Sequence, residues 1–158
     1  MEIRSRHHLR SDEADEIVSA VEEALGVDLG ERELEAAELD DGPDLYLVDG
    51  EPLVARYDGE PFLTVRGALA TEPERRRVTV DAGAVEFVTN GADVMRPGIE
   101  DVDDGIEEGD LVVIREVSHG KPLAIGRALE DGDAMLGDEG KVVESLHHVD
   151  DELWALEV

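Results

Sequence analysis

The sequence predicts an α+β protein, in which one helix and a small antiparallel sheet precede a β-rich half that holds a second, short helix. Apolar residues recur at helical spacing in two places, and short runs of β-forming residues bounded by turn residues fill much of the remainder. Leu, Ile, Val and Phe make up about 28% of the chain, above the level typical of disordered chains. A folded core is therefore expected.

The first helix is predicted to begin at Ser11 and to end at Gly26. Ser11 is a suitable N-cap, the acidic residues that follow it suit the helix dipole, and glycine commonly ends helices. The apolar positions of this helix recur with a period of three to four residues: Ala14, Ile17, Val18, Val21, Ala24 and Leu25.

The rest of the first half is predicted to form a small antiparallel sheet on which this helix packs. Two dipeptides typical of hairpin turns, Asp49-Gly50 and Asp58-Gly59, separate its last three β-like runs. The four runs cover residues 33–39, 45–50, 51–59 and 60–67.

A linker is predicted at residues 70–77, ATEPERRR, because a proline interrupts the apolar pattern there. We therefore expect two domains, residues 1–74 and 75–158.

The second half is predicted to be a compact barrel or open roll of short strands. Its helix is expected to begin after Asp81, which can cap it, and to end at Asn90-Gly91. The expected strands lie in residues 76–80, 94–99, 110–117, 122–129, 141–149 and 152–158.

The charge of the chain is strongly negative throughout. Asp and Glu number 42 against 14 Lys and Arg, only two of them lysine, and the net charge of −28 divides into −12 for residues 1–77 and −16 for residues 78–158. Such a surface repels itself in dilute salt, whereas at about 1 M salt the Debye length falls to roughly 3 Å. We therefore expect a molar-salt cytoplasm, as in a halophilic archaeon; an ordinary acidic protein is the alternative.

Several classes of site are not expected. The chain has no cysteine, and neither a nucleophile elbow nor a phosphate-binding glycine loop is present. The acidic run at residues 100–110 departs from an EF-hand loop, since Gly105 and Val112 stand where oxygen ligands are needed, although weak cation binding by this run stays open. Neighbouring histidines in a strand point apart. We therefore expect no enzyme, cofactor or metal site.

Targeting and membrane segments are also not expected. The first residues have no apolar stretch typical of a signal peptide, and no apolar run approaches about 20 residues. A soluble, cytoplasmic protein that does not bind membranes is the expectation.

One segment differs from the acidic remainder, because only Glu86 and Asp93 are acidic between Ala82 and Ile99. This segment, VDAGAVEFVTNGADVMRPGI, resembles the PUA domain, an RNA-binding module named for pseudouridine synthase and archaeosine transglycosylase, as do EEGDLVVI, GKPLAIGRAL and GKVVESLHHVDDELW further on. Upstream, DLYLVDGEPLVARYDGEPFLTVRGAL resembles the pre-PUA domain of the malignant T-cell-amplified-sequence family and its archaeal relatives.

The resemblance implies a C-terminal pseudobarrel with an RNA groove beside the short helix. Glycines let a backbone approach phosphate closely, and Arg96 can donate a bidentate pair of hydrogen bonds. Glu86 stands where relatives often place a basic residue, which weakens the expected electrostatic attraction. The RNA-binding residues that the resemblance implies are Gly83, Asn90, Gly91, Met95, Arg96, Pro97, Gly98, Lys121 and Lys141.

The function that the resemblance implies is RNA binding in translation initiation or recycling, on transfer RNA or the small ribosomal subunit, beside a partner with an SUI1-type domain. Two alternatives stay open. The first is an accessory factor in transfer RNA modification, and the second is a protein–protein adaptor that does not contact RNA.

Overall fold

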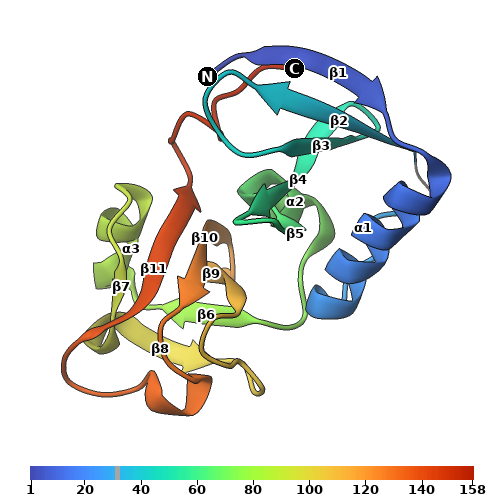
Figure 1. Cartoon of the computed structure of the whole chain (residues 1–158). Coiled ribbons are helices and arrows are strands. Elements are labelled where there is room, and N and C mark those ends of the chain that lie inside the picture. The colour runs from blue at the N-terminus through green and yellow to red at the C-terminus, as the bar shows by residue number, and fades with distance from the viewer. Residues whose placement is uncertain (31–32) are drawn as a thin grey trace.

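Two sheets joined by a short connection form the framework of the chain (Figure 1). The computed structural model describes residues 1–30 and 33–158. The first sheet has five strands in the order β1-β2-β3-β4-β5. The strands and helices of this half are β1 (Ile3–His8), α1 (Ser11–Leu25), β2 (Leu34–Leu39), β3 (Leu45–Val48), β4 (Glu51–Tyr57), β5 (Glu60–Leu63) and α2 (Val65–Thr71).

The second sheet has six strands in the order β7-β11-β10-β9-β6-β8. Strand β6 pairs with β9 in parallel and every other described strand pair is antiparallel, so the α+β class with a mixed, nearly closed pseudobarrel is confirmed. The elements of this half are β6 (Arg77–Val80), α3 (Ala82–Thr89), β7 (Val94–Met95), η1 (Arg96–Gly98), β8 (Ile99–Val102), β9 (Leu111–Glu116), β10 (Pro122–Ala128), η2 (Gly132–Ala134) and β11 (Lys141–His148).

Helix α1 follows the prediction except at its first residue. It buries five of the six predicted apolar positions, and Gly26 ends it with a φ of 67° while its N–H donates to the Glu22 carbonyl. Ser11 is already helical, so Arg10, whose backbone is extended, takes the N-cap position, and no side chain caps the helix there. The expectation that Ser11 is the N-cap was therefore wrong.

Strand β1 and helix α2 are two elements that the sequence patterns did not predict. Strand β1 pairs with β2 at the edge of the first sheet, although most of its residues are exposed. The run predicted as a strand over residues 60–67 leaves the sheet after Leu63, because the Thr64 hydroxyl accepts from the Gly67 N–H at 3.1 Å and starts α2. Gly67 is needed there, since a Cβ would collide with the carbonyl oxygen of Leu53.

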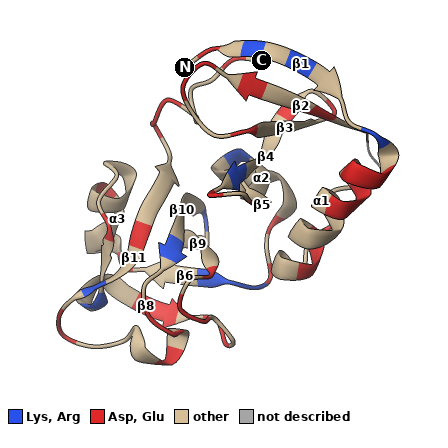
Figure 2. Cartoon of the chain, in the orientation of Figure 1, with Lys and Arg blue, Asp and Glu red and all other residues tan. Residues whose placement is uncertain are grey.

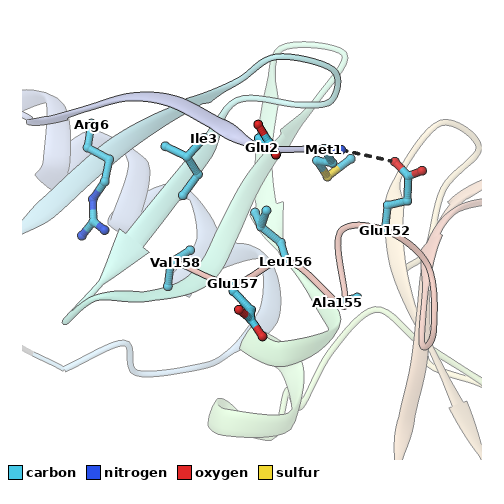
Figure 3. Close-up of a pocket in the computed structure, with 9 residues that line it drawn as sticks. All are labelled: Met1, Glu2, Ile3, Arg6, Glu152, Ala155, Leu156, Glu157 and Val158. Carbon is cyan, nitrogen blue, oxygen red and sulfur yellow. Dashed lines mark ion pairs between the residues drawn. The ribbon is translucent and has the colours of Figure 1, made fainter.

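The C-terminal segment after β11 is not the strand predicted over residues 152–158, and that prediction was wrong. The Asp151 carboxylate accepts hydrogen bonds from the backbone N–H of His148 and of Trp154, both at 2.8 Å, so the chain turns instead of extending. Leu153 and Leu156 then pack into the core of the first half. Figure 3 shows Leu156 and Val158 beside Ile3, around a hollow of about 680 Å³.

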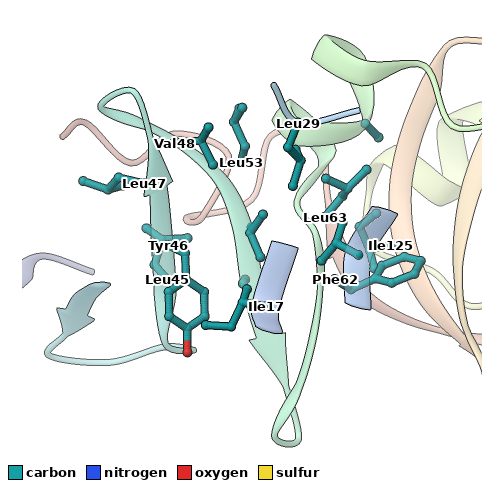
Figure 4. Packing of buried hydrophobic residues seen from close by; sticks show 14 of the residues in the cluster. Ile17, Leu29, Leu45, Tyr46, Leu47, Val48, Leu53, Phe62, Leu63 and Ile125 are labelled. Atoms are coloured by element: carbon teal, nitrogen blue, oxygen red, sulfur yellow. The ribbon is translucent and has the colours of Figure 1, made fainter. Parts of the chain in front are cut away.

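Side chains from both sheets share one hydrophobic core. Phe62 and Leu63 of β5 belong to the same buried cluster as Ile125 of β10 (Figure 4), and Leu111 and Val113 of β9 join it. A second cluster lies within the six-stranded sheet and includes Val78, Val80, Val88, Ile114, Met135 and Val143. The two halves are therefore packed against each other, and the domain boundary after residue 74 stays a prediction.

Acidic side chains are distributed over both halves, as Figure 2 shows for the outer side of α1 and for the loops of the second half. No helix in the described residues is both long and apolar enough to cross a membrane.

Candidate functional site

The nearly uncharged segment that follows β6 borders a groove of about 480 Å³ on the surface of the second half. Helix α3 forms one wall, and β7 with the η1 turn forms the other. Six of the lining residues are Gly83, Ala84, Phe87, Met95, Pro97 and Gly98. The structure thus brings four predicted site residues, Gly83, Met95, Pro97 and Gly98, to one place.

The narrow end of the groove depends on a close approach between η1 and the first turn of α3. A Cβ at Gly98 would lie 3.1 Å from the Cβ of Ala84, which is tighter than an ordinary contact. Asp81 joins the two elements, because its N–H donates to the Gly98 carbonyl at 2.9 Å while its carboxylate caps α3 at the Ala84 N–H. The predicted capping role of Asp81 is confirmed.

The other end of α3 lies at Asn90-Gly91, as the sequence predicted, and it packs close to β11. Asn90 is the C-cap, and Gly91 follows with a φ of 89°, a backbone conformation that residues with a Cβ rarely adopt. A Cβ at Gly91 would also lie 2.8 Å from Nε2 of His148. Asn90 and Gly91 therefore shape the end of the helix, outside the lining of the groove.

Two large apolar side chains stand open to solvent over the groove. Phe87 is 65% exposed and Met95 is 49% exposed. Met95 is one of the predicted site residues, whereas Phe87 is not. Helical spacing could have predicted the exposure of Phe87. Ala84 and Val88, four residues apart, share the inner face of α3, whereas Phe87 is turned about 100° away from Val88.

The charges beside the groove are largely matched. The Asp93 carboxylate accepts from the backbone N–H of Ser145 at 2.8 Å and from Nζ of Lys141 at 3.1 Å. These contacts, the Ser145 bond first, hold the pKa of Asp93 below its ordinary value. Lys141 also pairs with Met95 across β11 and β7, so it neighbours a residue of the groove without lining it, and its contact with RNA stays a prediction.

Arg96 does not line the groove, although it lies in the predicted turn. Its Nε and Nη1 donate to the carbonyls of Ala134 and Glu139 at 2.8 and 2.9 Å, and its Nη2 lies 3.3 Å from the Glu130 carboxylate. The side chain therefore holds the loop between β10 and β11 in place. A direct contact between Arg96 and RNA stays a prediction, and it would require these bonds to be exchanged.

Lys121 lies at a different place from the other predicted residues. It belongs to the turn between β9 and β10, and it lines a hollow with Arg115 and His119 rather than the α3 groove. Its sequence neighbours gave no sign of this separation, because the distance depends on the pairing of β9 with β6, which are far apart in the sequence.

Within the described ranges, no group of three or more His, Asp or Glu side chains is arranged to hold a metal ion. The buried His147 instead contacts Asp151 through Nδ1 at 2.8 Å. Burial opposes the ionisation of Asp151, but bonds from His147 and from two backbone N–H groups hold its pKa below the ordinary value. This pair fixes the turn after β11.

Comparison with known families divides the chain in the same order as its sheets. Residues 76–149 match the PUA domain, and residues 5–66 match a domain of unknown function, DUF1947.

Relatives match over most or all of the chain. An uncharacterized protein of Methanocaldococcus jannaschii is 35% identical over 98% of both chains. Translation machinery-associated protein 20 of Saccharomyces cerevisiae is 30% identical over 80% of this chain and 74% of its own length. Among solved structures, a hypothetical protein of Pyrococcus horikoshii superimposes with a TM-score of 0.84 at 34% identity, covering 96% of this chain and 98% of the other. A conserved PUA domain protein of Thermoplasma acidophilum gives 0.83 at 30% identity with the same coverage.

Proposed function

Because the chain belongs to the family of PUA-domain proteins that includes translation machinery-associated protein 20, we propose that it is a non-enzymatic RNA-binding protein of translation. In this proposal residues 75–158 form the RNA-binding PUA domain and residues 1–74 the pre-PUA domain. The protein acts in the cytoplasm of a halophilic archaeon, where molar salt screens its net charge of −28.

The observation that carries the proposal is the exposed pair Phe87 and Met95 above an open groove. Proteins bind unpaired bases by stacking them on exposed aromatic side chains, and each stacked base contributes about 1–3 kcal/mol. Stacking does not rely on long-range attraction, so it persists in molar salt. A strongly acidic protein can therefore bind RNA at this groove.

The backbone around the groove supports the same proposal. Gly83 is exposed in the first turn of α3, and Gly98 lies on η1 against Ala84, so two glycines and the small Ala84 side chain line this part of the groove. A phosphate can approach such a backbone closely. Asp81 and Asp93 are engaged by hydrogen bonds, which leaves Glu86 as the acid of α3 that RNA would meet.

The RNA that we propose is transfer RNA or RNA of the small ribosomal subunit, with a partner that carries an SUI1-type domain. The name of the yeast relative supports a place in translation. An accessory role in transfer RNA modification and an adaptor role without RNA are the alternatives, and co-purification from molar-salt lysate separates the three. Ribosomal subunits support the proposal, a modification enzyme supports the first alternative, and protein free of RNA supports the second.

The direct test is to replace Phe87 with alanine and to measure binding to transfer RNA and to small ribosomal subunits in molar KCl. Leu136→Ala is the matched control, because Leu136 is 59% exposed and does not line the groove. We expect Phe87→Ala to weaken binding about tenfold through the loss of one stacked base, and Leu136→Ala to leave it unchanged. Equal binding by the parent protein and Phe87→Ala would refute the groove assignment.

A further inference from the structure

A second hollow, of about 510 Å³, lies between the end of α2 and the turn that joins β9 to β10. Six of the residues that line it are Leu69, Pro73, Arg77, Arg115, His119 and Lys121. Basic side chains are thus gathered at one place on a chain that has three times as many acidic as basic residues.

Two cations of this hollow, Arg115 and Lys121, differ from the other cations of the second half. Arg96, Arg127 and Lys141 each lie within 4.0 Å of a carboxylate. Neither Arg115 nor Lys121 forms an ion pair with any residue that the structure describes. On a surface so rich in carboxylates, two neighbouring cations without such partners are a specific feature of this hollow.

Glu116 lies between the two in sequence, yet it forms no ion pair with either of them. Its carboxylate accepts from the backbone N–H groups of Ser118, His119 and Lys121 at 2.9, 2.7 and 3.0 Å. These bonds, that of the Lys121 amide first, hold the pKa of Glu116 below its ordinary value. The turn is therefore built from backbone bonds to Glu116, and the side chains of Arg115 and Lys121 are left available.

Arg115 is held so that its outer nitrogens remain available. Its Nε donates to the hydroxyl of the buried Thr79 at 2.8 Å, which fixes the guanidinium. Its Nη1 lies near Gly120, where an added Cβ would come within 3.4 Å. A guanidinium anchored through Nε can donate its two terminal amino groups to a phosphate.

The acidic residues that the structure describes along the hollow form no ion pair with Arg115 or Lys121. Glu72 and Glu74 line it from the α2 side, and both are exposed to solvent. Arg77 is already bound to Asp103, with Nε 2.7 Å from the carboxylate. Arg115 and Lys121 are therefore the groups that an anion would contact.

The hollow runs beside β6 from Arg77 to the β9–β10 turn, and this turn meets the end of β6 from which α3 leads. Thr79, which anchors Arg115, is followed by Val80, whose carbonyl accepts from the N–H of Val117 at 3.0 Å in the β9–β10 turn. Helix α3 begins two residues after Val80. We propose that the hollow binds a backbone phosphate of the same RNA strand whose bases occupy the groove, an inference that rests on the proposed function.

The test compares RNA binding by two double variants in molar KCl. The first, Arg115→Gln with Lys121→Gln, removes both cations of the hollow. The second, Arg4→Gln with Arg10→Gln, removes the same charge from exposed positions in and after β1. Transfer RNA is the probe, and we expect at least about tenfold weaker binding for the first variant and no change for the second, because a lost charge-assisted contact weakens binding about tenfold.

Lys121→Gln alone guards against a folding defect, because the Lys121 side chain is exposed and its amide bond to Glu116 is unaffected. We expect it to keep the melting temperature and to lower RNA affinity. If the hollow variants bind like the parent protein while Phe87→Ala binds weakly, this inference is overturned and the proposed function stands.

An amide-resolved titration with inorganic pyrophosphate separates the remaining outcomes. We expect shifts at His119, Gly120 and Lys121 in the parent protein and their loss in the double variant. If the parent binds no RNA, the proposed function fails, and pyrophosphate shifts at the turn would then assign the hollow to another phosphate ligand. Absence of shifts together with unchanged RNA binding, or capture of an acidic peptide instead of RNA, contradicts the inference.

Discussion

The second half of the chain has apolar side chains at two places that differ in burial. Towards the first sheet, Leu111, Val113 and Ile125 share a core with β5, and the C-terminal segment adds Leu153 and Leu156 to it. At α3, by contrast, Phe87 and Met95 remain open to solvent above their groove. We call the buried contact of Leu111, Val113 and Ile125 with β5 and the C-terminal segment the seam. The difference in burial indicates that the seam stabilises the fold, whereas the groove serves binding.

The cations show the same division. Arg96 and Arg127 bond backbone carbonyls and carboxylates that tie loops to the fold. Arg115 and Lys121 make no ion pair with the described residues. A cation's partners, rather than its presence in the sequence, thus distinguish stabilising residues from candidate ligands of RNA.

Lowering the salt concentration should have the largest effect, because it should unfold the seam and the α3 groove together. At 0.1 M salt the Debye length is about 10 Å, so neighbouring carboxylates on the surface repel one another across that distance. We expect the midpoint of thermal unfolding to fall markedly between molar and 0.1 M KCl, measured by circular dichroism. A midpoint that stays constant or rises as the salt is diluted would remove the halophilic interpretation.

Truncating a buried side chain at the seam should lower stability much more than truncating an exposed one at the groove. Leu153 is 6% exposed, and its replacement by alanine should lower the free energy of unfolding by about 2–4 kcal/mol, the range for a buried leucine. Phe87→Ala should change it by less than about 0.5 kcal/mol, because the ring is mostly exposed. Denaturant titrations in molar KCl measure both, and equal losses for the two variants would contradict the division.

Replacing Arg96 with alanine should have a smaller effect on stability. The variant loses two hydrogen bonds to carbonyls and one ion pair, and the side chain is 23% exposed, so about 1–2 kcal/mol is expected. The loss corresponds to a melting temperature lower by roughly 2–8 °C. Amide exchange should increase at residues 134–140. Weaker RNA binding at an unchanged melting temperature would instead make Arg96 a direct ligand, as the sequence suggested.

Much of the fold could be predicted because its signals are local. Helix α3, with its Asp81 cap and its Asn90-Gly91 end, is set by neighbours in sequence. The C-terminal segment could not be predicted in this way, because apolar residues at 153 and 156 suit a strand as well as a turn. Asp151 turns the chain through bonds to His148 and Trp154, and Leu153 and Leu156 then pack against residues of the first half that are far away in the sequence.

The candidate site was predicted in part for the same reason. Gly83, Met95 and Gly98 belong to one continuous segment, so their common location follows from the pattern. The positions of Arg96 and Lys121 depend on partners far along the chain, at Glu139 for the first and through the β6–β9 pairing for the second. Phe87 was not among the predicted site residues, although its helical position differs from that of the buried Val88.

The salt dependence of RNA affinity tests most directly the claim that the groove binds by stacking and directed hydrogen bonds. The logarithm of the association constant for transfer RNA should be measured against the logarithm of KCl concentration from about 1 to 3 M. With Arg115 and Lys121 as the cations that meet phosphate, we predict a slope no steeper than about −1.4, at about −0.7 for each neutralised phosphate. A slope of about −4 or steeper, or binding that is undetectable in molar KCl, would contradict the account.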